Sequence, residues 1–171
     1  MYEDTSTLRT VFVAGLKDAH ALENQALSLM DRQIERLANY PEMEARLREH
    51  RAETEGQIAR LEEILSGLGE THSSLKDAAL SFTGNMAAIG HTFADDEVIK
   101  NSFANYAFEN FEIASYTGLI TLAEDGYGSA TAALRMTLDE EQRMADWVRA
   151  HIPATMRRYI ALREEGATAS H

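Results

Sequence analysis

The sequence predicts an all-α antiparallel bundle of four long helices. Its 171 residues include only two prolines, Pro41 and Pro153, so long helices are permitted over almost the whole chain. Apolar residues recur at steps of three and four along four separate segments, which is the spacing of one buried helical face. No segment has the alternating pattern of a strand. We expect one domain over residues 1–171, long enough to bury a core without disulfides.

The first two helices are expected at about residues 7–38 and 41–68. A cap at residues 4–6 precedes the first helix, Pro41 suits the first turn of the second, and Gly69 should stop it. The middle of the second apolar stripe is polar, although both of its ends are apolar. That stripe reads Met43, Leu47, His50, Glu53 or Thr54, Gln57, Leu61, Ile64 and Leu68.

Two further long helices are expected at about residues 96–125 and from about residue 129 onward. Pro153 should kink or restart the last helix, which resumes to about residue 163, and residues 166–171 should be frayed. Residues 75–89 form a shorter segment that is poor in charge and is expected to be a crossover helix. Four long helices with one long connection make the ferritin-like layout.

Carboxylates occupy inward positions on all four long helices. Soluble helices keep Glu on the wet face, because an unpaired buried carboxylate loses its hydration. Spacings of three, which let two side chains reach one ion, occur in His50-x-x-Glu53 and Glu109-x-x-Glu112. The pattern predicts one shared cation, or two bridged by carboxylates. The candidate ligands are Glu23, His50, Glu53, Glu109, Glu112 and Glu141.

Several of these residues have a structural alternative. Thr54 could take the core position and leave Glu53 on the flank of its helix. Glu141, which follows two other acidic residues, could belong to a solvated acidic patch. His50 taken alone could be an interface histidine whose hydrogen bonds are satisfied.

The sequence leaves open whether two further side chains near these positions take part in the site. His20 is expected at the surface or on a flank of the first helix. Tyr116 is expected to be a core aromatic residue, and it lies one turn beyond Glu112, where its hydroxyl could reach a metal-bound oxygen.

The composition limits the metal and the partners. The chain has no cysteine, so any metal must be held by oxygen and imidazole, which favours iron, manganese, magnesium or calcium over zinc. The net charge of −12 opposes nucleic acid and anionic membranes as partners. No apolar stretch approaches the length of a membrane span, and the first residues lack a signal-peptide pattern. We expect a soluble cytoplasmic protein.

Four stretches of the chain resemble the ferritin-like YciE/YciF family. The matching runs are residues 18–27, 50–62, 106–116 and 140–147, and the resemblance spans about residues 7–165. It implies a ferritin-like bundle, usually a homodimer, associated with bacterial stress responses and with a metal centre. The inward acidic positions of the family fall here on Glu23, Glu53, Glu109, Glu112 and Glu141, with His50 beside them. Some relatives have a histidine where this chain has Glu55.

Two functions follow as hypotheses. The first is a di-metal protein, with iron or manganese, that reacts with peroxide or oxygen or holds metal during stress. The second is a non-catalytic structural or interaction protein of the stress response, in which the acidic centre is vestigial and its acids pair with Arg, His or water. Phe82 and Phe93 are candidates for its dimer surface.

Overall fold

The computed structural model describes residues 3–71, 75 and 95–170, and these residues form an all-α structure. The long helices are α1 (Glu3–Ile34), α2 (Pro41–Gly67), α4 (Glu97–Gly126) and α5 (Thr131–Glu164), and the 3-10 turn η2 (Gly128–Ala130) leads into α5. None of the described residues lies in a strand, so the predicted fold class is confirmed. The predicted crossover helix at 75–89, with Phe82, and Phe93 beyond it, falls outside the described residues, apart from Leu75.

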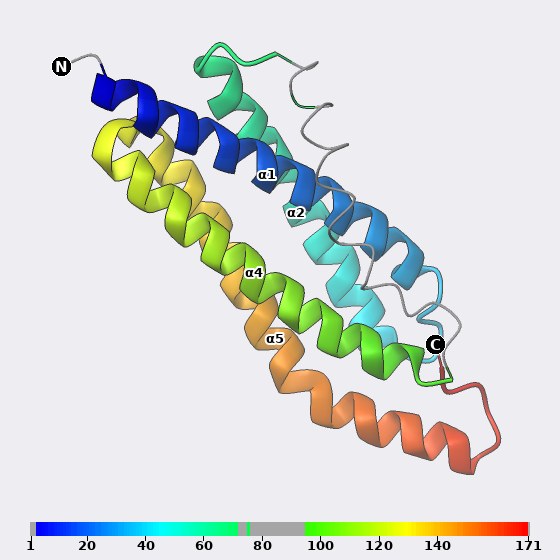
Figure 1. Ribbon diagram of the computed structural model, residues 1–171. Helices are drawn as coiled ribbons and strands as arrows, with labels where there is room; N and C mark the ends of the chain where they lie inside the picture. Colours follow the sequence, from blue (N-terminus) through cyan, green and yellow to red (C-terminus); the bar gives the residue numbers. More distant parts are fainter. Residues whose placement is uncertain (1–2, 72–74, 76–94, 171) are drawn as a thin grey trace.

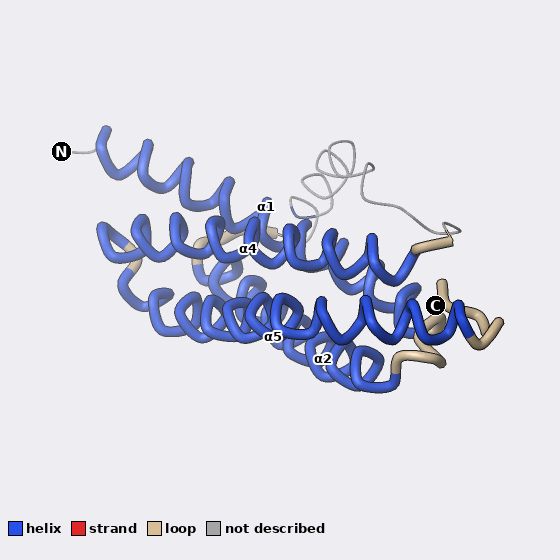
Figure 2. The backbone as a smooth tube through the Cα atoms, turned by 90° about the horizontal axis from the view of Figure 1, so that it is seen from below, coloured by secondary structure: helices blue, strands red, loops and turns tan. Residues whose placement is uncertain are grey.

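The four long helices lie side by side as two antiparallel pairs (Figures 1 and 2). Helices α1 and α5 run in one direction, and α2 and α4 run in the other. The α4–α5 contact is the most extensive, followed by α1–α2 and then by α1–α4, whereas α2 and α5 touch only sparingly. The bundle therefore consists of two hairpins, α1–α2 and α4–α5, that meet mainly along α1 and α4.

Glycines with a positive φ end two of the helices. Gly69 has a φ of 81° and Gly166 has a φ of 70°, a conformation that side chains other than that of glycine disfavour. In each case the next amide reaches back to an orphan carbonyl: Glu70 N donates to Leu65 O (3.0 Å), and Ala167 N donates to Leu162 O (2.9 Å). The predicted stop at Gly69 is confirmed.

The other helix ends differ modestly from the prediction. Helix α1 begins at Glu3, ahead of the expected cap at residues 4–6, and ends at Ile34 instead of residue 38. Helix α5 continues through Pro153 without interruption. It bends along the orange stretch of Figure 1 that includes this residue, as expected where a proline removes a helical hydrogen bond.

The residues after α5 are tied to the bundle, so the predicted frayed tail is wrong for the described part. Tyr40 Oη donates to Ala169 O (2.6 Å), and Val98 N, in the first turn of α4, donates to Ser170 O (2.9 Å). Ala169 is only 3% exposed. The amide of Val98 is free to donate because the first amides of a helix have no partner within that helix. Both donors belong to segments that are distant in sequence, so the composition of the chain end did not indicate these contacts.

Two apolar clusters fill the bundle, one toward each end. One cluster includes Leu22, Leu47, Phe108 and Met144, and the other includes Phe12, Leu16, Leu61, Leu119 and Leu134. On α2, α4 and α5 the stretch between the two clusters contains buried polar residues, and on α1 the buried Glu23 directly follows Leu22, where the first cluster begins. A buried polar layer therefore separates the two clusters.

Helices α1 and α4 approach each other closely where glycine leaves room. A Cβ atom at Gly15 would lie 2.9 Å from Leu119 Cδ2, and one at Gly126 would lie 2.8 Å from Leu8 Cδ2. Both distances are shorter than a normal carbon–carbon contact. A methyl group at either position would therefore require the leucine side chain opposite it, or the helix, to shift.

Within the part of the chain that the structure describes, no helix combines the length and the apolar character needed to cross a bilayer.

Candidate metal centre

The polar layer between the apolar clusters contains acidic side chains from three of the long helices and a histidine from the fourth. Glu23 lies on α1, His50 on α2, Glu109 and Glu112 on α4, and Glu141 on α5. None of the five is more than 5% exposed. The solvated-patch alternative for Glu141 is therefore excluded, because its side chain is fully buried.

His50, Glu109 and Glu141 form a group that could hold a metal ion. His50 Nε2 lies 3.4 Å from Glu109 Oε2 and 3.7 Å from Glu141 Oε2. One ligand atom of each residue lies within 4.8 Å of the others. One imidazole and two carboxylates on three helices are a donor set that suits a transition-metal ion.

Each of the four buried carboxylates has one oxygen without a hydrogen-bond partner. A buried acceptor left without a donor costs free energy, and the cost is greater when the group is charged. A bound cation would remove this cost at all four positions, so these residues fit a metal. The oxygens are Glu23 Oε2, Glu109 Oε2, Glu112 Oε1 and Glu141 Oε2.

Burial and the neighbouring charges shift the pKa values of this cluster. Burial raises the pKa of Glu23 to about 8, although the hydrogen bond from Tyr116 lowers it. Burial and the neighbouring carboxylates raise the pKa values of Glu112 and Glu141 well above the usual range. Burial alone would lower the pKa of His50, but Glu109 and the other nearby acids raise it well above its usual value. A cation would compete with protons for these groups.

Glu53 lies beside this cluster instead of within it. Thr54 is fully buried and takes the core position, whereas the Glu53 side chain is 20% exposed. Glu53 Oε2 lies 3.0 Å from His50 Nδ1 and 3.2 Å from Arg46 Nη2. The hydrogen bond with His50, together with Arg46, lowers the pKa of Glu53 to about 2 despite partial burial. The sequence left Glu53 and Thr54 as alternatives for the inward position, and the structure places Thr54 there.

Tyr116 and His20 have different places relative to the cluster. Tyr116 is 1% exposed, and its Oη donates to Glu23 Oε1 at 2.5 Å, so it supports one of the buried carboxylates. His20 Nε2 instead lies 3.1 Å from Glu62 Oε1, on a side chain that is 42% exposed. His20 itself is buried, so the expected surface position is wrong, and it pairs with Glu62 instead of with the acidic cluster.

Gln57 and Glu140 were not predicted as site residues, yet both are buried at its border. Gln57 Nε2 donates to Glu141 Oε1 and, at 3.1 Å, to Glu140 Oε2. Glu140 also pairs with Arg60, which balances its charge. The position of Gln57 in an otherwise apolar stripe was a usable signal. The sequence around Glu140 contained no such signal, because the residues that pair with Glu140 lie on another helix.

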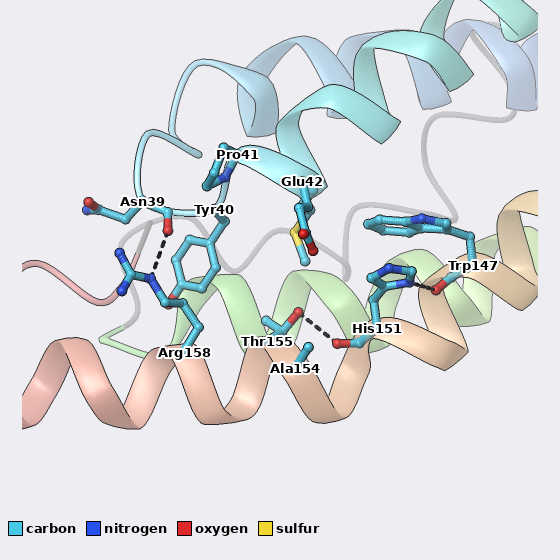
Figure 3. Close-up of a pocket in the computed structure, with 10 residues that line it drawn as sticks. Asn39, Tyr40, Pro41, Glu42, Trp147, His151, Ala154, Thr155 and Arg158 are labelled. Carbon is cyan, nitrogen blue, oxygen red and sulfur yellow. Dashed lines mark hydrogen bonds between the residues drawn. The ribbon is translucent and has the colours of Figure 1, made fainter.

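A separate pocket of about 310 Å³ lies between the α1–α2 turn and α5 (Figure 3). Trp147 and His151 stack on one side of it with ring centroids 3.8 Å apart, and His151 Nδ1 donates to Trp147 O (2.7 Å). Tyr40 and Arg158 lie on the other side. None of the predicted ligands lines this pocket, so the buried cluster remains the candidate metal centre.

Comparisons with known proteins identify relatives of the whole bundle. A family model described as a domain of unknown function (DUF892) matches residues 7–161. YciF from Escherichia coli (strain K12) is 29% identical over 148 residues, which cover 80% of this chain and 84% of YciF.

Solved structures agree with this relationship. A crystal structure from Xanthomonas campestris pv. campestris has a TM-score of 0.76 and 28% identity, and covers 92% of this chain and 99% of its own. The Escherichia coli stress protein YciF has a TM-score of 0.65 and 24% identity, with coverages of 85% and 94%. YcfI from Rhodopseudomonas palustris has a TM-score of 0.66 and 25% identity, with coverages of 87% and 97%. The chain belongs to the DUF892 family of YciF-like proteins.

Proposed function

We propose that this protein is a metal-binding protein of the bacterial stress response. It holds iron or manganese in the polar layer of the bundle, through Glu23, His50, Glu109, Glu112 and Glu141. The observation that carries this proposal is the set of four buried carboxylates, each with an oxygen that receives no hydrogen bond. Among the described residues, His50 is the one imidazole that pairs with these acids, which is too little positive charge to balance all four if they are ionised.

The donor set is large enough for two cations. His50, Glu109 and Glu141 would hold one ion, and Glu23 and Glu112 would hold a second. Burial raises the pKa of Glu112, and the nearby Glu23, Glu141 and Glu109 raise it further, so the carboxylates assigned to the two ions lie close to one another. Hard oxygen ligands with one imidazole favour iron or manganese.

The bound pair would supply redox chemistry with peroxide or oxygen, or a store of metal during stress. The surrounding residues prepare the site. Tyr116 holds Glu23, Gln57 holds Glu141, and the apolar clusters on both sides exclude water from the layer. In this proposal the protein acts in the cytoplasm and is a homodimer.

A structural or interaction protein with a vestigial centre is the second candidate. It is favoured by the position of His50, whose ring nitrogens lie near Glu53, Glu109 and Glu141, so that a single imidazolium could partly balance the layer. Under this candidate the purified protein is stable and does not bind metal.

Metal content separates the two candidates. The protein would be purified without chelator from cells supplied with iron and manganese, and analysed by elemental mass spectrometry. We expect about two metal ions per chain and the loss of at least one of them in Glu109→Gln, which removes a ligand of the ion held with His50 and Glu141. Glu97→Gln is the matched control, because Glu97 is equally buried but pairs with Arg36 away from the polar layer.

The result that would reject the proposal is a well-folded wild-type protein that contains no iron or manganese and binds neither in calorimetric titration. That result would support the structural candidate. Equal loss of metal in Glu97→Gln and Glu109→Gln would also contradict the assignment, since it would show that metal content follows general stability.

A further inference from the structure

The two ring nitrogens of His50 face different surroundings. Nε2 is directed to the buried carboxylates, 3.4 Å from Glu109 Oε2 and 3.7 Å from Glu141 Oε2. Nδ1 lies 3.0 Å from Glu53 Oε2. The two nitrogens are both bonded to Cε1 but direct their lone pair or N–H bond away from each other, so a group that binds Nε2 need not contact Glu53.

Glu53 is itself held in place by cations on its outer side. Arg46 Nη2 lies 3.2 Å from Glu53 Oε2, and Arg143 Nη2, from α5, lies 3.6 Å from Glu53 Oε1. A carboxylate between two guanidinium groups offers only acceptors to the imidazole. The neutral ring of His50 can then place its single proton on Nδ1, which leaves the Nε2 lone pair free toward Glu109 and Glu141.

We propose that Glu53 is a positioning residue for the metal centre and not one of its ligands: it fixes the tautomer and the ring orientation of His50 so that Nε2 can bind the metal. This inference rests on the proposed metal-binding function. Histidine ligands commonly donate their other N–H to a carboxylate, and loss of that partner typically weakens metal binding by about 10- to 100-fold.

Glu53→Ala and Glu53→Gln test the role of this carboxylate. In the alanine variant the affinity for Mn²⁺, measured from the EPR signal of free Mn²⁺, should fall by about 10- to 100-fold. Glu53→Gln should lose less, because its amide oxygen still accepts from Nδ1–H. The control is Glu49→Gln, since Glu49 is the other carboxylate partner of Arg46 (3.1 Å), is 69% exposed and has no bond to His50.

The position of the proton on the His50 ring is a second measurement. It would not change in the Glu53 variants if Glu53 had only a structural role. In Zn²⁺-loaded protein labelled with ¹⁵N-histidine, wild type and Glu49→Gln should show His50 protonated at Nδ1 and bound through Nε2. Glu53→Ala should show a changed tautomer or a mixture, with helix content unchanged by circular dichroism. Glu53→Gln should retain the wild-type tautomer.

Unchanged Mn²⁺ affinity and unchanged His50 signals in Glu53→Ala, with metal bound by wild type, would overturn the positioning role and leave the proposed function intact. Loss of one bound ion per chain with an unchanged His50 tautomer would also overturn it, because Glu53 would then be a ligand. Absence of metal from wild type and Glu49→Gln alike would overturn the proposed function, and the positioning role with it.

Discussion

Glu97 and Glu112 are both buried carboxylates on α4, but their surroundings are opposite. Glu97 accepts two hydrogen bonds from Arg36, at 2.8 Å from Nε and 2.7 Å from Nη2. Glu112 Oε1 has no hydrogen-bond donor, and three acidic neighbours raise the pKa of Glu112 further after burial has raised it. The same substitution should therefore have opposite effects at the two positions.

Glu112→Gln should stabilise the metal-free protein at pH 8, because burial and the neighbouring acids raise the pKa of Glu112, and an amide avoids the cost of burying or protonating this carboxylate. Glu97→Gln should destabilise it by about 1–3 kcal/mol, since it breaks hydrogen bonds between charged groups. Urea unfolding in the presence of chelator measures both changes. Destabilisation of similar size in both variants would contradict the interpretation that no hydrogen-bond donor or cation balances the buried carboxylate of Glu112.

The sequence predicted most of the site at this scale, and the exceptions are informative. The inward positions of Glu23, Glu109, Glu112 and Glu141 follow from helical periodicity, because a period of 3.6 residues fixes which face a residue joins. Periodicity does not separate adjacent positions near the edge of a face. For that reason Glu53 and Thr54 remained alternatives until the packing of α2 was known.

Helix α1 lies so close to α4 at Gly15 that one added methyl group is expected to change the stability of the protein. Gly15→Ala should destabilise the protein, because the new Cβ would lie 2.9 Å from Leu119 Cδ2 in a packed cluster, and overpacking typically costs about 1–3 kcal/mol. Gly118→Ala, on α4, is the control. No atom lies within 4 Å of a Cβ there among the described residues, so the gain in helix propensity of up to about 1 kcal/mol should stabilise.

Thermal unfolding of the two glycine variants would check this prediction. An increase in Tm for Gly15→Ala comparable to that for Gly118→Ala would show that Leu119 repacks freely. In that case Gly15 would not set the separation of α1 and α4.

The elements themselves were largely predictable from local sequence. The start of α2 at Pro41 and its stop before Gly69 follow from the backbone chemistry of proline and glycine. The bend in the orange stretch of α5 that includes Pro153 (Figure 1) has the same origin. The docking of residues 168–170 was not predictable, because its donors come from the α1–α2 turn and from α4. Contacts between segments distant in sequence leave no local pattern.

The metal-free molecule should lose stability as the pH rises. Glu23 has an ordinary pKa near 4.5 and a pKa of about 8 in the folded protein, so folding favours its protonated form. The contribution of protonated Glu23 to the free energy of unfolding is fully present below about pH 4.5 and is lost as the pH rises through about 8. The raised pKa values of Glu112, Glu141 and His50 act in the same direction, since protons stabilise the fold at all of these groups.

Urea unfolding between pH 5 and pH 8, with chelator present, would measure this slope. We expect a decrease of a few kcal/mol over this range and a much smaller decrease in saturating Mn²⁺, because the cation takes the place of the protons. Stability that is flat or rising in the metal-free protein would contradict the charge imbalance of the polar layer.

The sparse contact between α2 and α5 has a consequence for how the molecule opens. The two hairpins share few direct contacts on that side, and part of the connection comes from the polar layer and its border, where His50 and Gln57 of α2 contact Glu141 of α5. Without metal, the α1–α2 hairpin should separate in sub-global openings that expose amides of α2 to hydrogen exchange. A cation held by all four helices would merge the two hairpins into one cooperative unfolding unit, so that α2 exchanges only through global unfolding.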